Sequence, residues 1–576
     1  MKENYILIDI KDKDTTAINK EVMNLAIDSF LKDNPKNNIS EIIYGDSLSK
    51  VFLEILNNDT TNVKNKDLLY DILEKIYDHW RSVKRYIISD QNNPRFEELD
   101  FLTLFDKFTE ALLGKYRELC FKLTGKKFTV YRQLPAFANA FLLTDSNSNY
   151  IYKELESAKV ITKIAFRTPF VSYSASNKRT GIFEIINANP IDGLNLSNKK
   201  WFLIPILCGK SRIHVCISER YISLGVSLSN LFQFDDDFKN SKPDGIILFG
   251  SNTIDGIYYD KEKDIYIGSL KERDEIDYFG YLKKIILTVH NIKMIENGKL
   301  PIHGAGISIK LNDTTTKNVI IVGDSGAGKS ETIEALRLIA NGQIQEITTI
   351  YDDMGYFEII DNQIYTSGTE IGAFVRTDDL ENDYVYKVFD RAIFLNPKGK
   401  NARLVLPVST YKEVSNKYHV DYVFYANNYK NSKEKIHIFK QVEDALLVFK
   451  EGKRFALGTT GEKGLVQTFF ANPFGPIQLE NTTNSLLETY FQLLFNNNIP
   501  IGELFTGLGL ENGKDNPKYA ARHLIELLIK WFVYKFFQRY NLAISRYKLT
   551  FFQNRQWNIP KKVRCNQRKK ANTFLY

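Results

Sequence analysis

The residues from 320 to 332 read IIVGDSGAGKSET. Within this stretch, Gly323, Gly328, Lys329 and Ser330 match the spacing G-x-x-x-x-G-K-[ST], which is typical of a phosphate-binding loop. A buried-strand composition precedes the glycines, and a helical pattern follows them, which is the context that such a loop requires. The stretch therefore predicts an α/β region in which a strand, a glycine-rich turn and a helix hold an anion.

The chemistry of the loop follows from its residue types. Glycines let backbone N–H groups turn toward an anion, and the N-terminus of the following helix adds a favourable dipole. We expect Lys329 to lie against the β- and γ-phosphates of ATP, and the Ser330 hydroxyl to bind Mg²⁺. The predicted nucleotide-binding residues are Gly323, Asp324, Ser325, Gly326, Ala327, Gly328, Lys329 and Ser330.

A second acidic element follows the loop by some twenty residues. Residues 347–353 read ITTIYDD, which predicts a short strand that ends in two carboxylates, Asp352 and Asp353. We expect this strand to run parallel to the strand before the loop, because a metal–phosphate complex finds hard oxygen ligands at that place. Two adjacent acids allow two metal ions, or one metal ion and one base.

The spacing and the type of the apolar residues change along the chain. Residues 21–33, 47–58, 68–88 and 101–123 carry apolar residues at three- and four-residue steps and predict helices. Residues 158–166, 200–208, 212–217 and 244–250 are β-branched and aromatic and predict strands. The predicted division is a helical N-terminal region (1–125), an α/β substrate-side lobe (126–295), a phosphate-loop lobe (296–528) and a basic C-terminal tail (529–576).

Composition limits the class of protein. The chain has 576 residues, of which 43% are hydrophobic and 25% charged, as in soluble globular proteins. Neither a secretory signal nor a membrane span is expected, and four cysteines in so long a chain predict reduced thiols and a cytoplasmic setting. The net charge of +8 is concentrated after Glu526, where no acid follows. Without a recognition module, this basic tail does not favour nucleic acid as a partner.

Several stretches around the loop resemble one family. They are LPIHGAGI (300–307), the loop itself, YDDMG (351–355), the run 265–291, GKNARLVLPV (399–408) and two long stretches, 458–476 and 501–528. Together they resemble the ATP-dependent phosphoenolpyruvate carboxykinases and their relatives, the HPr kinase/phosphorylases, over about 256–528. The resemblance implies a two-lobed α/β fold with a phosphate-loop lobe, here preceded by a helical region.

Carried over residue by residue, the resemblance implies a site for ATP, Mg²⁺ and Mn²⁺. Lys284, His303 and Asp353 would hold manganese, while Ser330 and Asp352 would hold magnesium. Arg403 would neutralise the moving phosphoryl group, and Lys283 would bind substrate or phosphate. The implied substrate pair is oxaloacetate and phosphoenolpyruvate. Tyr278 falls on a matching position, and Arg179 is the nearest candidate for a substrate-carboxylate arginine, because the family's Gly-Arg-Ser-Pro motif is absent.

Three functions remain open at this point. The first is the carboxykinase reaction, in which a cation stabilises the enolate that forms on decarboxylation. A lysine can act as its ligand because a second lysine and a divalent cation nearby push its pKa down. The second is a kinase that phosphorylates a protein serine or a small-molecule hydroxyl, with Asp352 or Asp353 as base. The third is a nucleotide-binding regulatory protein with little catalysis, in which the helical N-terminus and the basic tail serve as surfaces for a protein partner.

Overall fold

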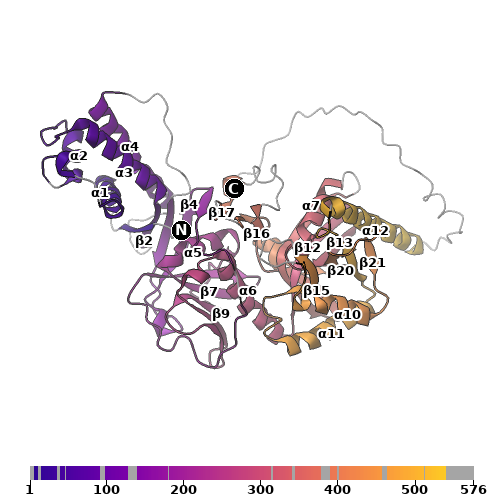
Figure 1. The fold of residues 1–576 in the computed structure, drawn as a ribbon. Coiled ribbons are helices and arrows are strands. Elements are labelled where there is room, and N and C mark those ends of the chain that lie inside the picture. The colour runs from indigo at the N-terminus through magenta and orange to yellow at the C-terminus, as the bar shows by residue number, and fades with distance from the viewer. Residues whose placement is uncertain are drawn as a thin grey trace, which may run out of the picture. The chain divides into compact units, whose positions relative to one another are not determined.

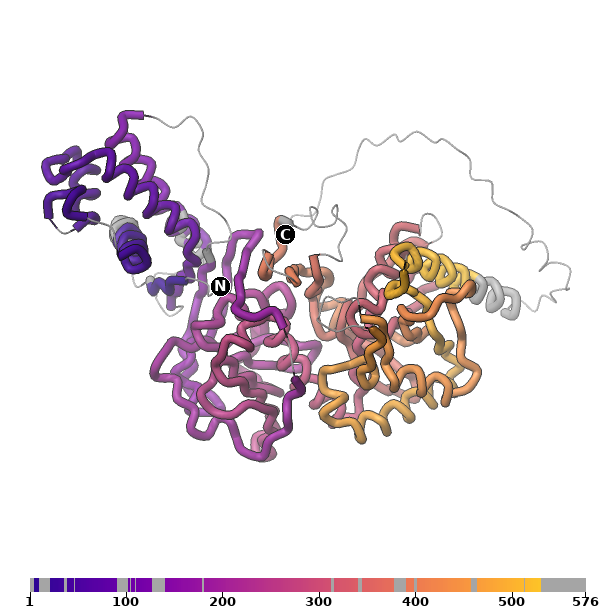
Figure 2. The backbone as a smooth tube through the Cα atoms, in the orientation of Figure 1, coloured from indigo at the N-terminus to yellow at the C-terminus, as the bar shows by residue number. Residues whose placement is uncertain are grey.

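The computed structural model describes residues 5–10, 15–35, 39–45, 47–90, 98–126, 139–178, 181–312, 315–339, 344–377, 389–397, 401–456, 464–511 and 513–539 (coloured in Figure 2). Its packing separates two units, Met1–Arg522 and His523–Tyr576. The predicted basic tail lies outside the described residues from position 540 onward. The finer division into lobes at 125, 295 and 528 stays a prediction.

A large sheet fills the first part of the described chain. Its strands are β1 (Tyr5–Ile10), β2 (Lys84–Asp90), β3 (Asn139–Asp145), β4 (Lys159–Phe166), β6 (Trp201–Cys208), β7 (Ser211–Ser218), β8 (Gln233–Phe234), β9 (Gly245–Ser251), β10 (Gly256–Asp260) and β11 (Ile265–Lys271). They are ordered β1-β2-β3-β4-β6-β7-β9-β11-β10, and β8 pairs with β6. The strands predicted at 158–166, 200–208, 212–217 and 244–250 are confirmed as β4, β6, β7 and β9.

Four helices cover the beginning of this sheet. They are α1 (Thr15–Asp33), α2 (Leu48–Leu56), α3 (Lys66–Ser82) and α4 (Glu98–Thr124), and Figure 1 shows them gathered together. Their apolar side chains share a core with Ile8 of β1, Ile87 of β2 and Phe141 of β3. These three strands are mutually parallel, as helical crossovers require. The region predicted as helical is therefore an α/β layer joined to the large sheet.

The helix predicted over residues 68–88 is wrong at its C-terminal end. Helix α3 ends at Ser82, and β2 begins two residues later. The β2 residues are buried on both faces of the sheet, so they show no alternation that would have distinguished a strand from a continued buried helix.

Helix α6 (Phe279–Glu296) is buried around its whole circumference. Its apolar residues share a core with the large sheet, and its Lys283 and Lys284 are buried as well. A surface helix would expose such lysines to water, so these two need partners within the protein. A six-residue helix, α5 (Ile222–Ser227), is also fully buried.

A second sheet carries the phosphate loop. Its strands are β12 (Leu300–Asn312), β13 (Thr315–Val322), β14 (Glu346–Ile360), β15 (Gln363–Gly368), β19 (Tyr418–His419), β20 (Tyr422–Asn427), β21 (Ile436–Ile438) and β24 (Ile501–Phe505). They are ordered β19-β15-β14-β12-β13-β20-β24-β21, with β13, β20 and β24 parallel. Helix α7 (Lys329–Ile339) follows the loop, while α10 (Val442–Glu451) and α11 (Glu480–Asn496) pack on this sheet.

The strand that carries the aspartate pair differs from the prediction. β14 runs in the same direction as β13, as predicted, but β12 lies between the two strands and is antiparallel to both. β14 also does not end at Asp353 but continues to Ile360. It then reverses at Asp361 and Asn362, whose positive φ angles of 49° and 56° suit the two-residue turn into β15. The aspartates therefore lie in the middle of a long strand.

Smaller elements complete the described chain. One four-stranded sheet is ordered β16 (Gly372–Arg376), β18 (Arg403–Pro407), β17 (Ile393–Leu395) and β5 (Phe170–Ser172), and a hairpin pairs β22 (Lys453–Ala456) with β23 (Gly464–Gln467). The remaining α-helices are α9 (Tyr411–Ser415) and α12 (Asn516–Arg539). In the described part of the chain, no helix combines the length and the apolar character needed to cross a membrane.

Candidate phosphate and cation site

The loop after β13 is held in shape by its own lysine. Lys329 Nζ donates to the carbonyl oxygens of Gly323 at 2.6 Å and Asp324 at 3.1 Å. This lysine is the first residue of α7, so its ammonium group closes the turn that leads into the helix. The same positive group and the helix N-terminus lie where an anion would be bound.

Side chains from two neighbouring strand ends fix the rest of the loop. Asn428 Nδ2 donates to the Gly326 carbonyl at 2.9 Å, and Thr506 Oγ1 donates to the Ala327 carbonyl at 2.6 Å. These hydrogen bonds tie the loop carbonyl oxygens to the ends of β20 and β24 and hold the loop in shape. Such preorganisation favours anion binding.

Gly328 is required at its position for two reasons. Its φ of +92° is unfavourable for any residue with a side chain, and an added Cβ would lie 2.7 Å from Thr506 Cβ. Thr506 can thus approach the loop closely only because position 328 carries no side chain.

The first aspartate of the pair contacts the loop helix. Asp352 Oδ1 accepts a hydrogen bond from Ser330 Oγ at 3.0 Å. Burial and the neighbouring charge of Asp353 raise the pKa of Asp352 above its usual value. A hydroxyl and a carboxylate are hard oxygen donors, so this pair fits Mg²⁺.

The second aspartate is the centre of a charged cluster. Asp353 Oδ1 lies 2.9 Å from His303 Nε2, and Asp353 Oδ2 accepts a hydrogen bond from Lys283 Nζ. Burial would raise the pKa of Asp353, but the charge of Lys283 holds it well below its usual range. The side chain is 24% exposed, so an ion could reach it from solvent.

The backbone explains how two successive aspartates serve one site. Side chains of adjacent strand residues normally point to opposite faces of a sheet. Asp353 has a φ of +117°, which is rare for a residue with a side chain and interrupts this alternation. Its partner across the ladder is Gly304, where an added Cβ would lie 2.6 Å from the Ile321 carbonyl oxygen. The unusual conformation thus occurs where the neighbouring strand is tightly packed.

Lys283 is the lysine that contacts the aspartate. Its side chain is fully buried and also lies 2.9 Å from Glu370 Oε1. Burial would lower the pKa of Lys283, but Asp353 and Glu370 raise it overall. Lys284 Nζ donates instead to the Gly181 carbonyl and lies 5.4 Å from the centre of the Phe183 ring. The manganese ligand role of Lys284 stays a prediction, whereas the contact with Asp353 belongs to Lys283.

The hydrogen-bond partners of His303 indicate whether a cation fits between this residue and Asp353. His303 Nδ1 lies 2.6 Å from the Ala471 carbonyl oxygen, which can only accept, so Nδ1 carries a hydrogen. In the neutral ring Nε2 is then an acceptor that faces a carboxylate oxygen at 2.9 Å. Two facing acceptors need a proton or a cation between them. Neighbouring ligands of an octahedral cation, at about 2.0–2.1 Å from it, are about 2.9 Å apart, so this pair fits a divalent cation.

The donor set consists of pairs of side chains. Across the residues that the structure describes, no group of three or more His, Cys, Asp or Glu side chains is arranged to hold a metal ion. The fit therefore rests on His303 with Asp353, and on Ser330 with Asp352. A cation bound by either pair would complete its shell with water or phosphate oxygens, which Mg²⁺ commonly does.

Arg403, which is predicted to neutralise the moving phosphoryl group, lies near the same aromatic ring as Lys283. The Arg403 guanidinium carbon is 5.1 Å from the ring centre of Phe374, and Lys283 Nζ is 5.8 Å from the same ring. Asn401 Oδ1 accepts a hydrogen bond from Arg403 Nε at 3.0 Å, and Asn401 Nδ2 donates to Tyr278 Oη at 3.3 Å. Three predicted residues thus meet around Phe374: Lys283 of α6, Tyr278 at the N-cap position of the same helix, and Arg403 of β18. Arg179, the weaker substrate candidate, lies outside the described residues.

Two charged residues of the site were not predicted as such. Glu370 is 1% exposed, and burial raises its pKa to about 7. Arg454 donates from Nε to Asp324 Oδ2 at 2.7 Å. Neither residue belongs to a sequence motif that marks it as part of the site. Each comes from a segment that only the fold brings to the site. The sequence offered no signal for Glu370 beyond the small residues that surround it.

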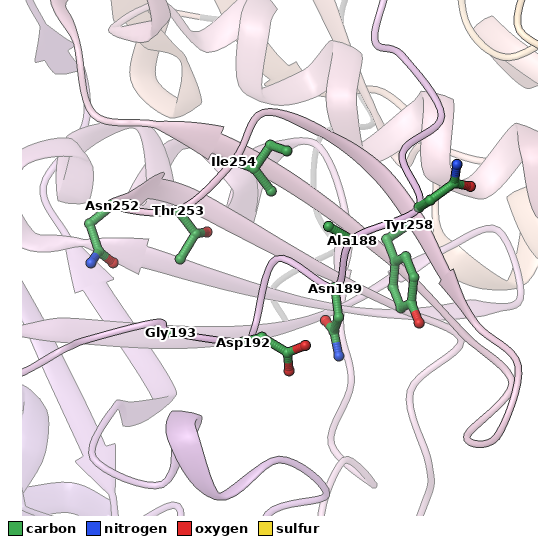
Figure 3. A pocket seen from close by; sticks show the side chains of 9 residues that line it. Ala188, Asn189, Asp192, Gly193, Asn252, Thr253, Ile254 and Tyr258 are labelled. Carbon is green, nitrogen blue, oxygen red and sulfur yellow. The ribbon is translucent and has the colours of Figure 1, made fainter.

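A hollow occurs in another part of the structure. Its lining includes four amide or carboxylate side chains, and none of the predicted site residues belongs to it. Figure 3 shows the residues that line it, Asn187, Ala188, Asn189, Asp192, Gly193, Asn252, Thr253, Ile254 and Tyr258.

Comparison with known proteins leaves the family open. No protein-family description matches the chain, and no curated protein matches it. Among solved structures, it is similar to the Hpr(Ser) kinase/phosphatase from Coxiella burnetii, with 14% sequence identity. That match covers 34% of this chain and 98% of the other, with a TM-score of 0.14. Because so low a score does not show a shared fold, the functional argument rests on the site itself.

Proposed function

We propose that this chain is an ATP-dependent phosphoenolpyruvate carboxykinase-like enzyme, which converts oxaloacetate and ATP to phosphoenolpyruvate, ADP and carbon dioxide. The observation that carries the proposal is the convergence of Lys283 and His303 on Asp353, next to the Ser330–Asp352 pair of the loop. A kinase for simple hydroxyl groups has no need of a buried lysine and a histidine on one carboxylate. The proposal includes a two-lobed arrangement, with a substrate-side lobe over 126–295 and a nucleotide lobe over 296–528.

The proposal gives each residue a role, which the contacts support for all of them except Lys284. Lys329 would exchange the Gly323 and Asp324 carbonyl oxygens for the nucleotide phosphates, and Ser330 with Asp352 would hold Mg²⁺. His303 and Asp353 would hold Mn²⁺, with Lys284 as the implied third ligand. Bound cations would neutralise phosphate charge and stabilise an oxyanion.

The reaction itself then needs few protein groups. In oxaloacetate the bond to the leaving carboxylate breaks, carbon dioxide departs, and the electron pair forms an enolate. The enolate oxygen attacks the γ-phosphorus of ATP in line, and ADP leaves. Lys283 would lie beside the reacting oxygen and stabilise its charge, while Arg403 would neutralise the equatorial oxygens of the moving phosphoryl group. No proton has to be removed from the substrate in this sequence.

A second candidate is a kinase for a protein serine or a small-molecule hydroxyl. Two observations favour it. Lys284, the implied manganese ligand, donates to the Gly181 carbonyl instead of pointing to Asp353. Lys283, the implied substrate lysine, is paired with the carboxylate of Glu370. A hydroxyl acceptor needs a base, and Asp352, whose pKa is raised, could take the proton.

The experiment that decides is a product analysis by phosphorus NMR. Purified full-length protein with ATP, Mg²⁺, Mn²⁺ and oxaloacetate should form ADP and phosphoenolpyruvate, and the Lys329→Met variant should not. If ATP is consumed only when serine peptides or small hydroxyl compounds are added, the kinase replaces the carboxykinase. If ATP binds without turnover under either condition, the protein is a nucleotide-binding regulator.

Other aspects of the proposal follow from the sequence alone. A small-molecule substrate, a cytoplasmic setting and a protein partner for the N-terminal helices are proposals that accompany the enzyme. Nucleic acid is not proposed as a partner, because no recognition module accompanies the basic tail.

A further inference from the structure

The phosphate loop contains a buried negative charge of its own. Asp324 follows the first glycine of the loop, and its side chain is 6% exposed. Its Oδ1 accepts a hydrogen bond from the Ser325 N–H at 2.7 Å, so one donor of the loop is turned toward this carboxylate. A carboxylate inside an anion-binding turn repels phosphate, and the repulsion is strong where water is excluded.

An arginine from a distant segment compensates this charge. Arg454, on β22, is 9% exposed and donates from Nε to Asp324 Oδ2 at 2.7 Å. His303 Nδ1 lies 3.6 Å from the other carboxylate oxygen. The carboxyl group therefore has a guanidinium group on one oxygen and the imidazole ring of His303 near the other.

The backbone around Arg454 is tied to the same loop. Asn428 Nδ2 donates to the Gly326 carbonyl of the loop and to the Phe455 carbonyl of β22, each at 2.9 Å. The Phe455 N–H in turn donates to Asn428 Oδ1 at 2.7 Å. One amide side chain thus fixes β22 against the loop, so the guanidinium group of Arg454 is held at Asp324 by its neighbours.

We propose that Arg454 is a positioning residue that neutralises Asp324 and thereby sets the affinity of the loop for polyphosphate. The proposal rests on the proposed function, in which the loop binds the phosphates of ATP. Asp324 in turn orders the loop through Ser325, so the pair combines a fixed turn with a balanced charge. Without the arginine, the ordered turn would present an uncompensated carboxylate to the nucleotide.

The test compares three variants by isothermal titration with MgATP, MgADP and AMP. Arg454→Met should weaken MgATP binding about tenfold or more, because it leaves a buried charge unpaired. The loss should be smaller for MgADP and under about twofold for AMP, since the repulsion grows with the phosphate charge near the loop. Asp324→Asn combined with Arg454→Met should restore MgATP binding to within about threefold. A merely structural role would weaken all three nucleotides alike.

Controls separate the possible outcomes. Arg337→Met removes one positive charge from an exposed position on α7 and should leave MgATP binding unchanged. If Arg454→Met does not fold, Asp324→Asn alone carries the test, and it should bind MgATP at least as tightly as the unmodified protein. Weaker binding by Asp324→Asn, no rescue in the double variant, or equal losses for AMP would overturn the inference. Failure of the unmodified protein to bind MgATP would overturn the proposed function as well.

Discussion

At the scale of single residues, the site is a set of buried charges that balance one another. Lys283 faces Asp353 and Glu370, and Arg454 faces Asp324. A buried charge that loses its partner costs more free energy than the pair contributes. Single substitutions in this set should therefore be severe, and double substitutions that remove both charges should be milder.

Lys283→Met should abolish turnover and lower the free energy of unfolding by about 3 kcal/mol, because it leaves carboxylates without their buried cation. Denaturant unfolding of Lys283→Met, of Glu370→Gln and of the double variant measures this effect. The double variant should recover a large part of the lost stability but none of the activity. Equal stability of Lys283→Met and the unmodified protein would show that the lysine is not the cation that holds these carboxylates.

Two buried histidines outside the site predict acid sensitivity. Burial lowers the pKa of His214 to about 4 and that of His290 to about 3. In the unfolded chain both titrate near pH 6.5, so the unfolded state binds more protons between that pH and the folded pKa. Stability should thus be complete above about pH 6.5 and should fall as the pH is lowered toward about 4.

The His290→Gln variant should lose less stability than the unmodified protein when the pH is lowered from 6.5 to 4.5. Chemical unfolding at the two pH values gives the difference for each protein. An identical loss in both proteins would mean that His290 is not the group that takes up the proton.

At the scale of secondary-structure elements, local pattern predicted the loop better than its surroundings. The strand before the loop and the helix after it are confirmed as β13 and α7, because periodicity and glycine spacing are local properties. The predicted direction of β14 is confirmed, but its place next to β13 is wrong, since β12 lies between them and strand pairing depends on distant segments. Glu370 and Arg454 could not be predicted for the same reason: only the fold brings them to Lys283 and Asp324.

Alanine substitution should be harmful at one glycine of the loop and favourable at a glycine of helix α4. Gly328→Ala should reduce MgATP affinity at least tenfold, because its φ is positive and Thr506 occupies the space of a Cβ. Gly114 lies within helix α4, and a Cβ there would meet nothing within 4 Å. Gly114→Ala should therefore raise stability by about 0.5–1 kcal/mol. Thermal unfolding and titration of both variants measure this contrast, and normal nucleotide binding by Gly328→Ala would contradict the structure of the loop.

At the scale of the whole molecule, the N-terminal helices belong to the large sheet. β1 and β2 extend it beyond β3, and the helices bury an apolar face of these strands. The sequence predicted these helices but not the strands that join them to the sheet, because β1 and β2 are short and resemble helix ends in composition.

Removal of residues 1–126 should consequently expose the apolar face of β3 and leave its edge unpaired. An exposed strand edge with an apolar face promotes aggregation. The truncated protein should be insoluble or should bind a hydrophobic dye strongly, whereas the full chain should not. A soluble truncated protein that binds MgATP like the full chain would show that the N-terminal region is an independent appendage.

The central claim is that a divalent cation and the nucleotide phosphates meet at His303, Asp353 and the phosphate loop. Pulsed electron paramagnetic resonance of the full-length protein with Mn²⁺ and ATP tests it most directly. The spectrum should show coupling of manganese to an imidazole nitrogen and to phosphorus in the same sample, and His303→Asn should lose only the nitrogen coupling. A spectrum identical to that of Mn²⁺ with ATP in free solution would contradict the account.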